Sequence, residues 1–132
     1  MTEDPHLGAA MTALTAAWNA ADGDAFAAEF TDDADFVNIY AMHAKGRQAI
    51  ARAHQAIFDG VYRGSRIAFA VMQSRALADG IVLAHIGATL QIPSGPLAGT
   101  LRALATAVFV REGSSWKISA FHNTREQEPP GR

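Results

Sequence analysis

Apolar residues recur at helical spacing near the start of the chain. Successive members of this stripe are four, three and four positions apart, and they are Leu7, Met11, Leu14 and Trp18. The spacing places all four on one face of a helix, which we expect to run from Leu7 to Ala21. The segment 22–24 (Asp-Gly-Asp) then predicts a helix end at glycine and an aspartate N-cap for a second, short helix that extends to Phe30.

The following positions indicate a strand and then a third helix. Residues 31–33 (Thr-Asp-Asp) predict a turn, and residues 34–41 predict a strand because β-branched and aromatic side chains are frequent among them. The third helix is expected to begin at residues 45–47 (Lys-Gly-Arg). Its apolar face includes one histidine and consists of Ile50, His54, Ile57, Phe58 and Val61.

From Arg66 onwards the helical period is lost and strand-like runs take its place. These runs are 67–76, 81–92, 100–111 and 116–124. The short segments between them are rich in Gly, Pro, Asp and Ser, which favour turns. Because strands joined by short turns pair antiparallel, we expect an α+β fold in which the helices pack on one face of a mainly antiparallel sheet.

Length and composition indicate one domain. The chain of 132 residues has room for a single core, expected to span residues 1–125, and a polar segment 126–132 that we expect to be disordered. No uncharged apolar stretch approaches the roughly 20 residues of a membrane span. The acidic start, residues 1–5, has no apolar segment of the kind found in signal peptides. These features predict a cytoplasmic protein with no membrane partner.

Composition also excludes several kinds of chemistry. With 0 cysteines the chain forms no disulfide and offers no thiolate. The 11 Lys and Arg residues are scattered and the net charge is -2, so we expect no nucleic-acid partner. Phosphate-binding glycine motifs are absent, so no cofactor is expected. No metal is expected either, because metal-binding spacing is lacking among His43, His54, His85 and His122.

Polar side chains interrupt otherwise apolar rows at five positions. Each shares its strand or helix face with apolar neighbours, and they are Asn38, Tyr40, His54, His85 and His122. A buried polar group without a partner costs roughly 1–3 kcal/mol, so each group needs another side chain, a water or a ligand. The five groups either satisfy one another in the core or line a cavity, and their number favours a cavity.

Carboxylates are not expected in this cavity. Asp32, Asp33 and Asp35 belong to the predicted turn and the start of its strand, where solvation explains them, and no Asp or Glu shares a face with Asn38. A general base that acts near neutral pH would therefore be a histidine.

Several local sequences resemble one known superfamily. Residues 17–20 (Ala-Trp-Asn-Ala), 22–24 (Asp-Gly-Asp) and 30–36 (Phe-Thr-Asp-Asp-Ala-Asp-Phe) resemble the nuclear transport factor 2-like superfamily. Its cone-shaped α+β fold is shared by ketosteroid isomerases, limonene epoxide hydrolases and SnoaL-type polyketide cyclases. Further similarity is to the SgcJ/EcaC subfamily, which is associated with natural-product gene clusters. That similarity is carried by Phe36-Val37-Asn38, Gly46-Arg47, His54, Gly64-Ser65-Arg66 and Phe121-His122-Asn123-Thr124.

The resemblance implies a homodimer that associates through the outer face of the sheet, and a pocket between the sheet and the helices. The positions it places near that pocket are Trp18, Phe36, Asn38, Tyr40, His54, Phe58, His85 and His122. The catalytic aspartates of ketosteroid isomerases are not matched, because Asn38 stands where we would look for the base. The Asp-Arg-Asp arrangement of limonene epoxide hydrolases is not matched either. Neither activity carries over to this chain.

Three functions are compatible with the sequence. The first is an accessory enzyme of polyketide or enediyne-type biosynthesis that isomerises, cyclises or hydrates a hydrophobic intermediate without a cofactor. His54 or His122 would then transfer protons, Asn38 and Tyr40 would hold an oxygen, and Trp18 and Phe36 would pack the carbon skeleton. The second is a non-catalytic protein that sequesters such a molecule in the same pocket. The third is a dimeric scaffold domain with a filled core.

Overall fold

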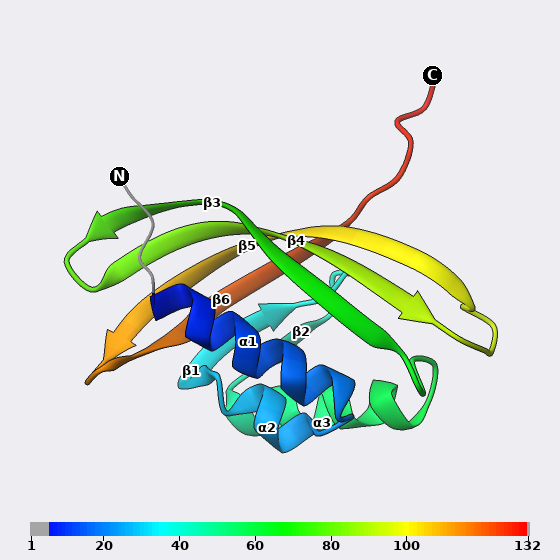
Figure 1. Cartoon of the computed structure of the whole chain (residues 1–132), viewed down its shortest axis with the longest axis horizontal. Coiled ribbons are helices and arrows are strands. Elements are labelled where there is room, and N and C mark those ends of the chain that lie inside the picture. The colour runs from blue at the N-terminus through cyan, green and yellow to red at the C-terminus, as the bar shows by residue number, and fades with distance from the viewer. Residues whose placement is uncertain (1–5, 132) are drawn as a thin grey trace.

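Three helices and six strands are formed within residues 6–131, the part of the chain that this computed structural model describes (Figure 1). The helices are α1 (His6–Asn19), α2 (Gly23–Ala27) and α3 (Arg47–Asp59). The strands are β1 (Phe30–Val37), β2 (His43–Lys45), β3 (Arg66–Ala78), β4 (Ile81–Ile92), β5 (Gly99–Glu112) and β6 (Ser115–Arg125). None of the helices in this range is long and apolar enough to cross a membrane.

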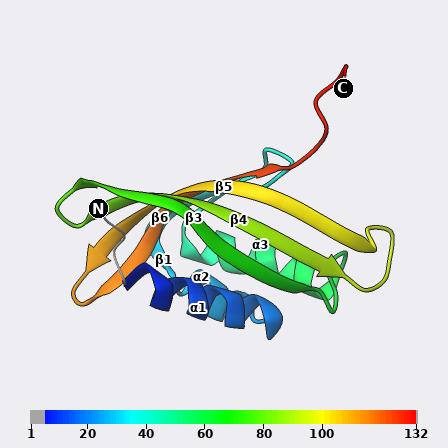
Figure 2. The same cartoon turned by 45° about the horizontal axis from the view of Figure 1, so that its top comes forward.

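All six strands belong to one curved sheet with the order β2-β1-β6-β5-β4-β3. Neighbouring strands are antiparallel except for β1 and β6, which are parallel. The three helices lie on one side of the sheet, which we call its inner face, and the opposite side is its outer face (Figures 1 and 2). This arrangement confirms the predicted α+β fold with a curved sheet and helices on one face.

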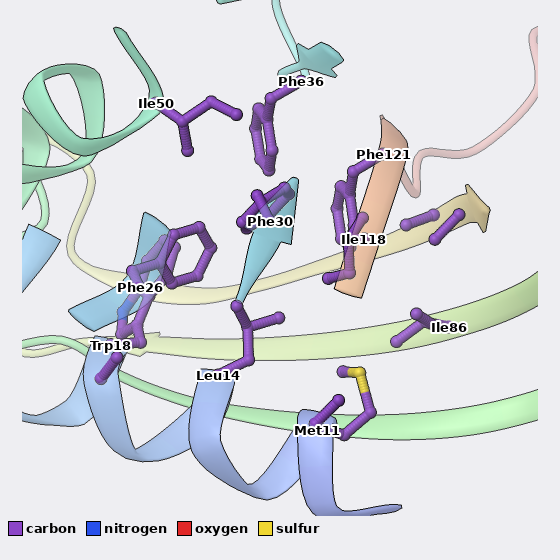
Figure 3. Close-up of a cluster of buried hydrophobic side chains, with 14 of the residues drawn as sticks. Met11, Leu14, Trp18, Phe26, Phe30, Phe36, Ile50, Ile86, Ile118 and Phe121 are labelled. Atoms are coloured by element: carbon purple, nitrogen blue, oxygen red, sulfur yellow. The ribbon is translucent and has the colours of Figure 1, made fainter. Parts of the chain in front are cut away.

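Buried aromatic and aliphatic side chains fill much of the space between helices and sheet. Met11 and Leu14 of α1, Phe30 of β1 and Ile118 of β6 point into one cluster (Figure 3), and Leu14, Phe30 and Ile118 have no exposed surface. Each such side chain contributes roughly 1.5–3 kcal/mol through its removal from water. The predicted stripe on the first helix is therefore the face of α1 that is buried in this cluster.

Two side-chain amides fix the helices relative to each other and to the sheet. Asn19, at the end of α1, accepts from the backbone N–H of Ile67 at 2.8 Å and donates to its carbonyl at 3.3 Å. Gln55 of α3 accepts from the N–H of Gly23 at 2.7 Å. A side chain at Gly23 would place a Cβ 2.6 Å from the carbonyl oxygen of Ala51, so only glycine permits this close approach of α2 to α3.

The region between α2 and β1 differs from the prediction. The second helix ends at Ala27 rather than Phe30, and β1 already begins at Phe30, so residues 31–33 lie in a strand and not in a turn. The guanidinium of Arg47 binds the carbonyl oxygen of Phe30 and the carboxylate of Asp32. This contact from α3 offsets the low strand propensity of the aspartates, and it comes from a residue 15 positions away.

A β-bulge in β6 changes which residues face the helices. Phe109 pairs with Ile118 but Val108 pairs with Ala120, so Ser119 is an extra residue in β6. Before the bulge Ile118 is buried, whereas after it the buried residue is Phe121 and His122 is exposed. Strict alternation would place Ile118 and His122 on the same face, and the bulge at Ser119 breaks this alternation.

The predicted strands after Arg66 agree with β3 to β6 to within two residues at each end. The short strand β2 was not predicted, because its three residues have no apolar pattern. Residues 126–131 form no helix or strand and are exposed. The predictions for residues 1–5 and for residue 132 fall outside the described part of the chain.

Candidate functional site

A cavity of about 410 Å³ lies between α3, the connection from β1 to β2, and the inner face of the sheet. Its wall is made mainly of aliphatic and aromatic side chains from all three helices and from β1, β3, β4, β5 and β6. Among the residues of this wall, all of them in the described range, there is no Asp, Glu, Lys or Arg. The size and the apolar wall are those of a site for a small organic molecule.

His54 is held in an aromatic box at one side of the cavity. Its ring stacks on Phe26 with 4.1 Å between the ring centroids and meets the edge of Phe36 at 4.6 Å. Trp18 and Phe58 lie farther away, each with its centroid 6.1 Å from that of His54. The position of His54 in the apolar stripe of α3 thus places an imidazole among aromatic rings, and only 4% of its surface is exposed.

The protonation state of His54 follows from one hydrogen bond and from burial. Nδ1 lies 2.8 Å from the carbonyl oxygen of Ile50, one turn earlier in α3. A carbonyl only accepts, so Nδ1 carries a proton and donates it to this bond. Burial lowers the pKa of His54 to about 4, although the bond to Ile50 opposes that shift. At neutral pH the ring is therefore neutral and its Nε2 is an acceptor.

Asn38 lies in the cavity wall, but its oxygen has a structural role. Its Oδ1 accepts from the backbone N–H groups of Tyr40 and Met42, both at 2.9 Å. These bonds hold the tight connection between β1 and β2, in which Ala41 has a φ of 63°. Tyr40 also lies in the wall, where it is 57% exposed. Of the two polar ends of Asn38, only the amide nitrogen remains for a ligand.

Trp18 lies in the wall of the cavity and Phe58 behind it. The indole Nε1 of Trp18 donates to the hydroxyl of Ser65 at 3.0 Å, so its polar group is satisfied within the protein. Phe58 contacts Trp18 edge to face at 5.0 Å and is 3% exposed. Phe58 therefore supports the wall without belonging to it.

His85 and His122 do not lie at the cavity, contrary to the prediction. In β4 the buried residues are those that alternate with His85, and in β6 the bulge at Ser119 turns His122 outward. Both histidines are on the outer face of the sheet, on either side of Thr106 of β5. The Oγ1 of Thr106 lies 3.2 Å from Nδ1 of His85. The sheet thus separates both side chains from any molecule in the cavity.

Two polar residues of the wall were missed by the sequence reasoning. The Oδ1 of Asn123 is buried and has no hydrogen-bond partner in the described structure. Tyr62 is 8% exposed, and the pKa of its hydroxyl is raised mainly by burial and then by Tyr40, while Arg125 opposes the increase. Asn123 becomes visible from the sequence only if the bulge at Ser119 is known, and Tyr62 lies beyond the end of α3.

Polar clusters elsewhere do not form a metal centre. Among the side chains of residues 7–131, no three His, Cys, Asp or Glu are placed to hold a metal ion. Outside the cavity, the carboxylate of Asp35 lies 2.7 Å from Nε2 of His43 and 3.3 Å from Nζ of Lys45. These neighbours lower the pKa of Asp35, with the bond to His43 as the largest cause.

Comparison with known proteins assigns the family. The model of the SnoaL-like domain matches residues 7–123, nearly the whole chain. The chain belongs to the SnoaL-like domain family. This membership confirms the predicted superfamily, and the cavity is thus the pocket of a SnoaL-like domain. No curated protein sequence matches this SnoaL-like domain significantly.

Solved structures support the same fold. A protein from Nostoc punctiforme with a cystatin-like fold is 28% identical, with a TM-score of 0.82 over 96% of this SnoaL-like domain and 81% of that chain. A second cystatin-like protein, from Caulobacter vibrioides, is 26% identical, with a TM-score of 0.80 over 92% and 88% of the two chains. A ketosteroid isomerase-like protein from Erwinia carotovora atroseptica is 16% identical, with a TM-score of 0.76 over 93% and 95%. At that identity the likeness concerns the fold alone.

Proposed function

We propose that this SnoaL-like domain binds a small hydrophobic molecule in the cavity beside His54, as a binding protein or accessory enzyme of natural-product biosynthesis. The observation that carries the proposal is the cavity of about 410 Å³, whose uncharged wall includes His54 with its single N–H committed to Ile50. A scaffold domain has no need of such a space, because empty volume in a core lowers stability. The cavity therefore favours ligand binding over a purely structural role.

The state of His54 favours binding over turnover. Its Nδ1 proton is committed to Ile50, so His54 has no second proton to give as an acid at neutral pH. As a base it would become a buried cation among Phe26, Phe36 and Trp18, and the cavity wall supplies no carboxylate to stabilise that charge. Sequestration of a ligand is thus the simpler function, and catalysis by His54 requires a substrate that becomes an anion beside the ring.

The natural-product role rests on the similarity to the SgcJ/EcaC subfamily. The positions that carry this similarity include Asn38 and His54, which lie in the cavity wall. They also include Ser65, whose hydroxyl accepts a hydrogen bond from Trp18. The chemistry of the site agrees with this role, since polyketide and polyene intermediates are large, apolar and oxygenated. The expected ligand is therefore an intermediate or product of such a pathway.

Titration with the neutral dye Nile red tests the proposed function. Saturable binding is expected for the wild-type protein, with at least tenfold weaker binding for Ala88→Phe, because the added ring projects from β4 into the cavity. Ala16→Phe adds the same ring to an exposed position of α1 and should leave the affinity unchanged. Absence of saturable binding, or equal affinity of wild type and Ala88→Phe, would show that the cavity is not a ligand site.

A homodimer through the outer face of the sheet is also part of the proposal. Met72 and Leu104 are 66% and 52% exposed on this face, where the neighbouring positions of β4 are His85 and Gly87. Large exposed apolar side chains on a sheet face are typical of interfaces. We expect a dimer mass in sedimentation equilibrium, and a monomer mass for Leu104→Arg, which would place two cations in the interface. A monomeric wild-type protein would exclude this assembly.

A further inference from the structure

The ligand's polar chemistry is constrained by the one ring nitrogen that His54 leaves free. A neutral imidazole has a single N–H, and the bond from Nδ1 to the carbonyl of Ile50 at 2.8 Å uses it. Nε2 is then a lone-pair acceptor, and within residues 6–131 no side chain or backbone group donates a hydrogen bond to it. A molecule in the cavity satisfies Nε2 only if it brings a donor.

The wall of the cavity constrains the ligand's charge. With no charged side chain among the residues that surround it, the cavity offers no partner for a buried ion. Transfer of an unpaired carboxylate or ammonium group into such a space is far more costly than transfer of a hydroxyl. The part of the ligand that lies beside His54 is therefore neutral.

A second polar side chain of the cavity wall comes from β6. Asn123 projects from β6, and its buried Oδ1 has no partner in the described part of the chain. Its neighbours on this side are apolar, since Phe121 stacks on Phe36 with centroids 5.0 Å apart and Ala105 pairs with Asn123 across the sheet. An amide carries both a donor and an acceptor, so Asn123 can bind a ligand group of either kind. Nε2 of His54 can bind only a group that donates a hydrogen bond.

We infer that the ligand of this cavity is a mainly apolar molecule whose part beside His54 is neutral and donates a hydrogen bond from a hydroxyl or N–H group to Nε2 of His54. This inference rests on the proposed function, because it requires that the cavity holds a ligand. It separates phenols, alcohols and N–H heterocycles, which bind through His54, from ketones, ethers and carboxylates, which leave Nε2 unsatisfied.

A pair of naphthalene probes tests the inference. 2-Naphthol has a hydroxyl donor, whereas 2-methoxynaphthalene has the same ring and an oxygen that only accepts. The methoxy compound is the more hydrophobic of the two, so a cavity without a donor preference binds it at least as tightly. We expect wild-type protein to bind 2-naphthol about tenfold more tightly at pH 7, the order of magnitude that one net hydrogen bond produces.

Two variants assign this preference to His54. His54→Phe removes the acceptor while it keeps an aromatic ring between Phe26 and Phe36, so the preference should disappear and 2-methoxynaphthalene should still bind. Ala16→Phe adds an aromatic ring at an exposed position of α1 outside the cavity and should keep the tenfold preference. If His54→Phe does not fold, the wild-type protein still gives an answer. The ¹⁵N resonance of Nε2 should shift on addition of 2-naphthol and stay unchanged with 2-methoxynaphthalene.

The outcomes separate the two proposals. If neither probe binds in the cavity, the proposed function fails. If both bind with equal affinity, or 2-methoxynaphthalene binds more tightly, ligand binding stands and the inferred donor is wrong. A preference for 2-naphthol that persists in His54→Phe, or an unchanged Nε2 resonance, assigns the donor contact to another residue and overturns the inference.

Discussion

His54 shows how an ordinary side chain acquires unusual properties from its surroundings. Its place among the apolar residues of α3 was visible in the sequence, and this periodicity was sufficient to predict its burial. The aromatic box came from Phe26 and Phe36, on two other elements, so its geometry was not visible. The same reasoning failed for His122, because one extra residue at Ser119 reverses the alternation in β6.

The low pKa of His54 predicts a loss of stability in acid. The folded protein holds this pKa at about 4, whereas the ordinary value is 6.5, so the unfolded chain binds a proton at higher pH than the folded protein does. The stability that the neutral ring gives the folded protein is therefore fully present above pH 6.5 and is lost as the pH falls from 6.5 to 4. This pKa shift corresponds to a loss of about 3 kcal/mol in the free energy of unfolding.

Urea unfolding between pH 7 and pH 4 measures this effect. Carboxylates such as Asp35 also titrate in acid, so the relevant quantity is the difference between wild type and His54→Phe, from which their contributions cancel. We expect His54→Phe to lose less stability than wild type over this range, and the exposed-site control Ala16→Phe to behave like wild type. Parallel pH profiles for wild type and His54→Phe would show that His54 is not held neutral by burial.

Helices and strands could be predicted from the sequence where one of their faces is buried and the other is solvated. This holds for the strands β4 to β6 and for the stripe on α1, which agree with the structure. The start of β1 was missed because its aspartates favour turns, and Arg47 on a distant helix stabilises the strand instead. Side-chain roles in connections were also missed, since the sequence reasoning did not anticipate that Oδ1 of Asn38 organises the turn before β2.

The turn held by Asn38 gives a prediction at this scale. Asn38→Ala removes the acceptor for the N–H groups of Tyr40 and Met42 and should lower the free energy of unfolding by about 1 kcal/mol. Asn38→Asp retains an oxygen in the same place and should recover most of that loss. Chemical denaturation of the three proteins compares them, and equal stability of Asn38→Ala and wild type would mean that the turn does not depend on this side chain.

The whole molecule combines a packed core with a cavity between the helices and the sheet. Leu14, Phe30 and Ile118 fill the core beneath α1 (Figure 3). Near α3, by contrast, the side chains surround a cavity of about 410 Å³. The fold was predictable because length, periodicity and family resemblance agree. The cavity itself depends on how six strands curve around three helices, and no local pattern in the sequence encodes its volume.

The most direct test of the account is a crystal structure of the protein with 2-naphthol. We predict the naphthalene ring in the cavity between α3 and the inner face of the sheet, with its hydroxyl oxygen within hydrogen-bonding distance of Nε2 of His54. A cavity closed by its own side chains, or a ligand bound only on the outer face, would show that this SnoaL-like domain does not bind small molecules in its cavity.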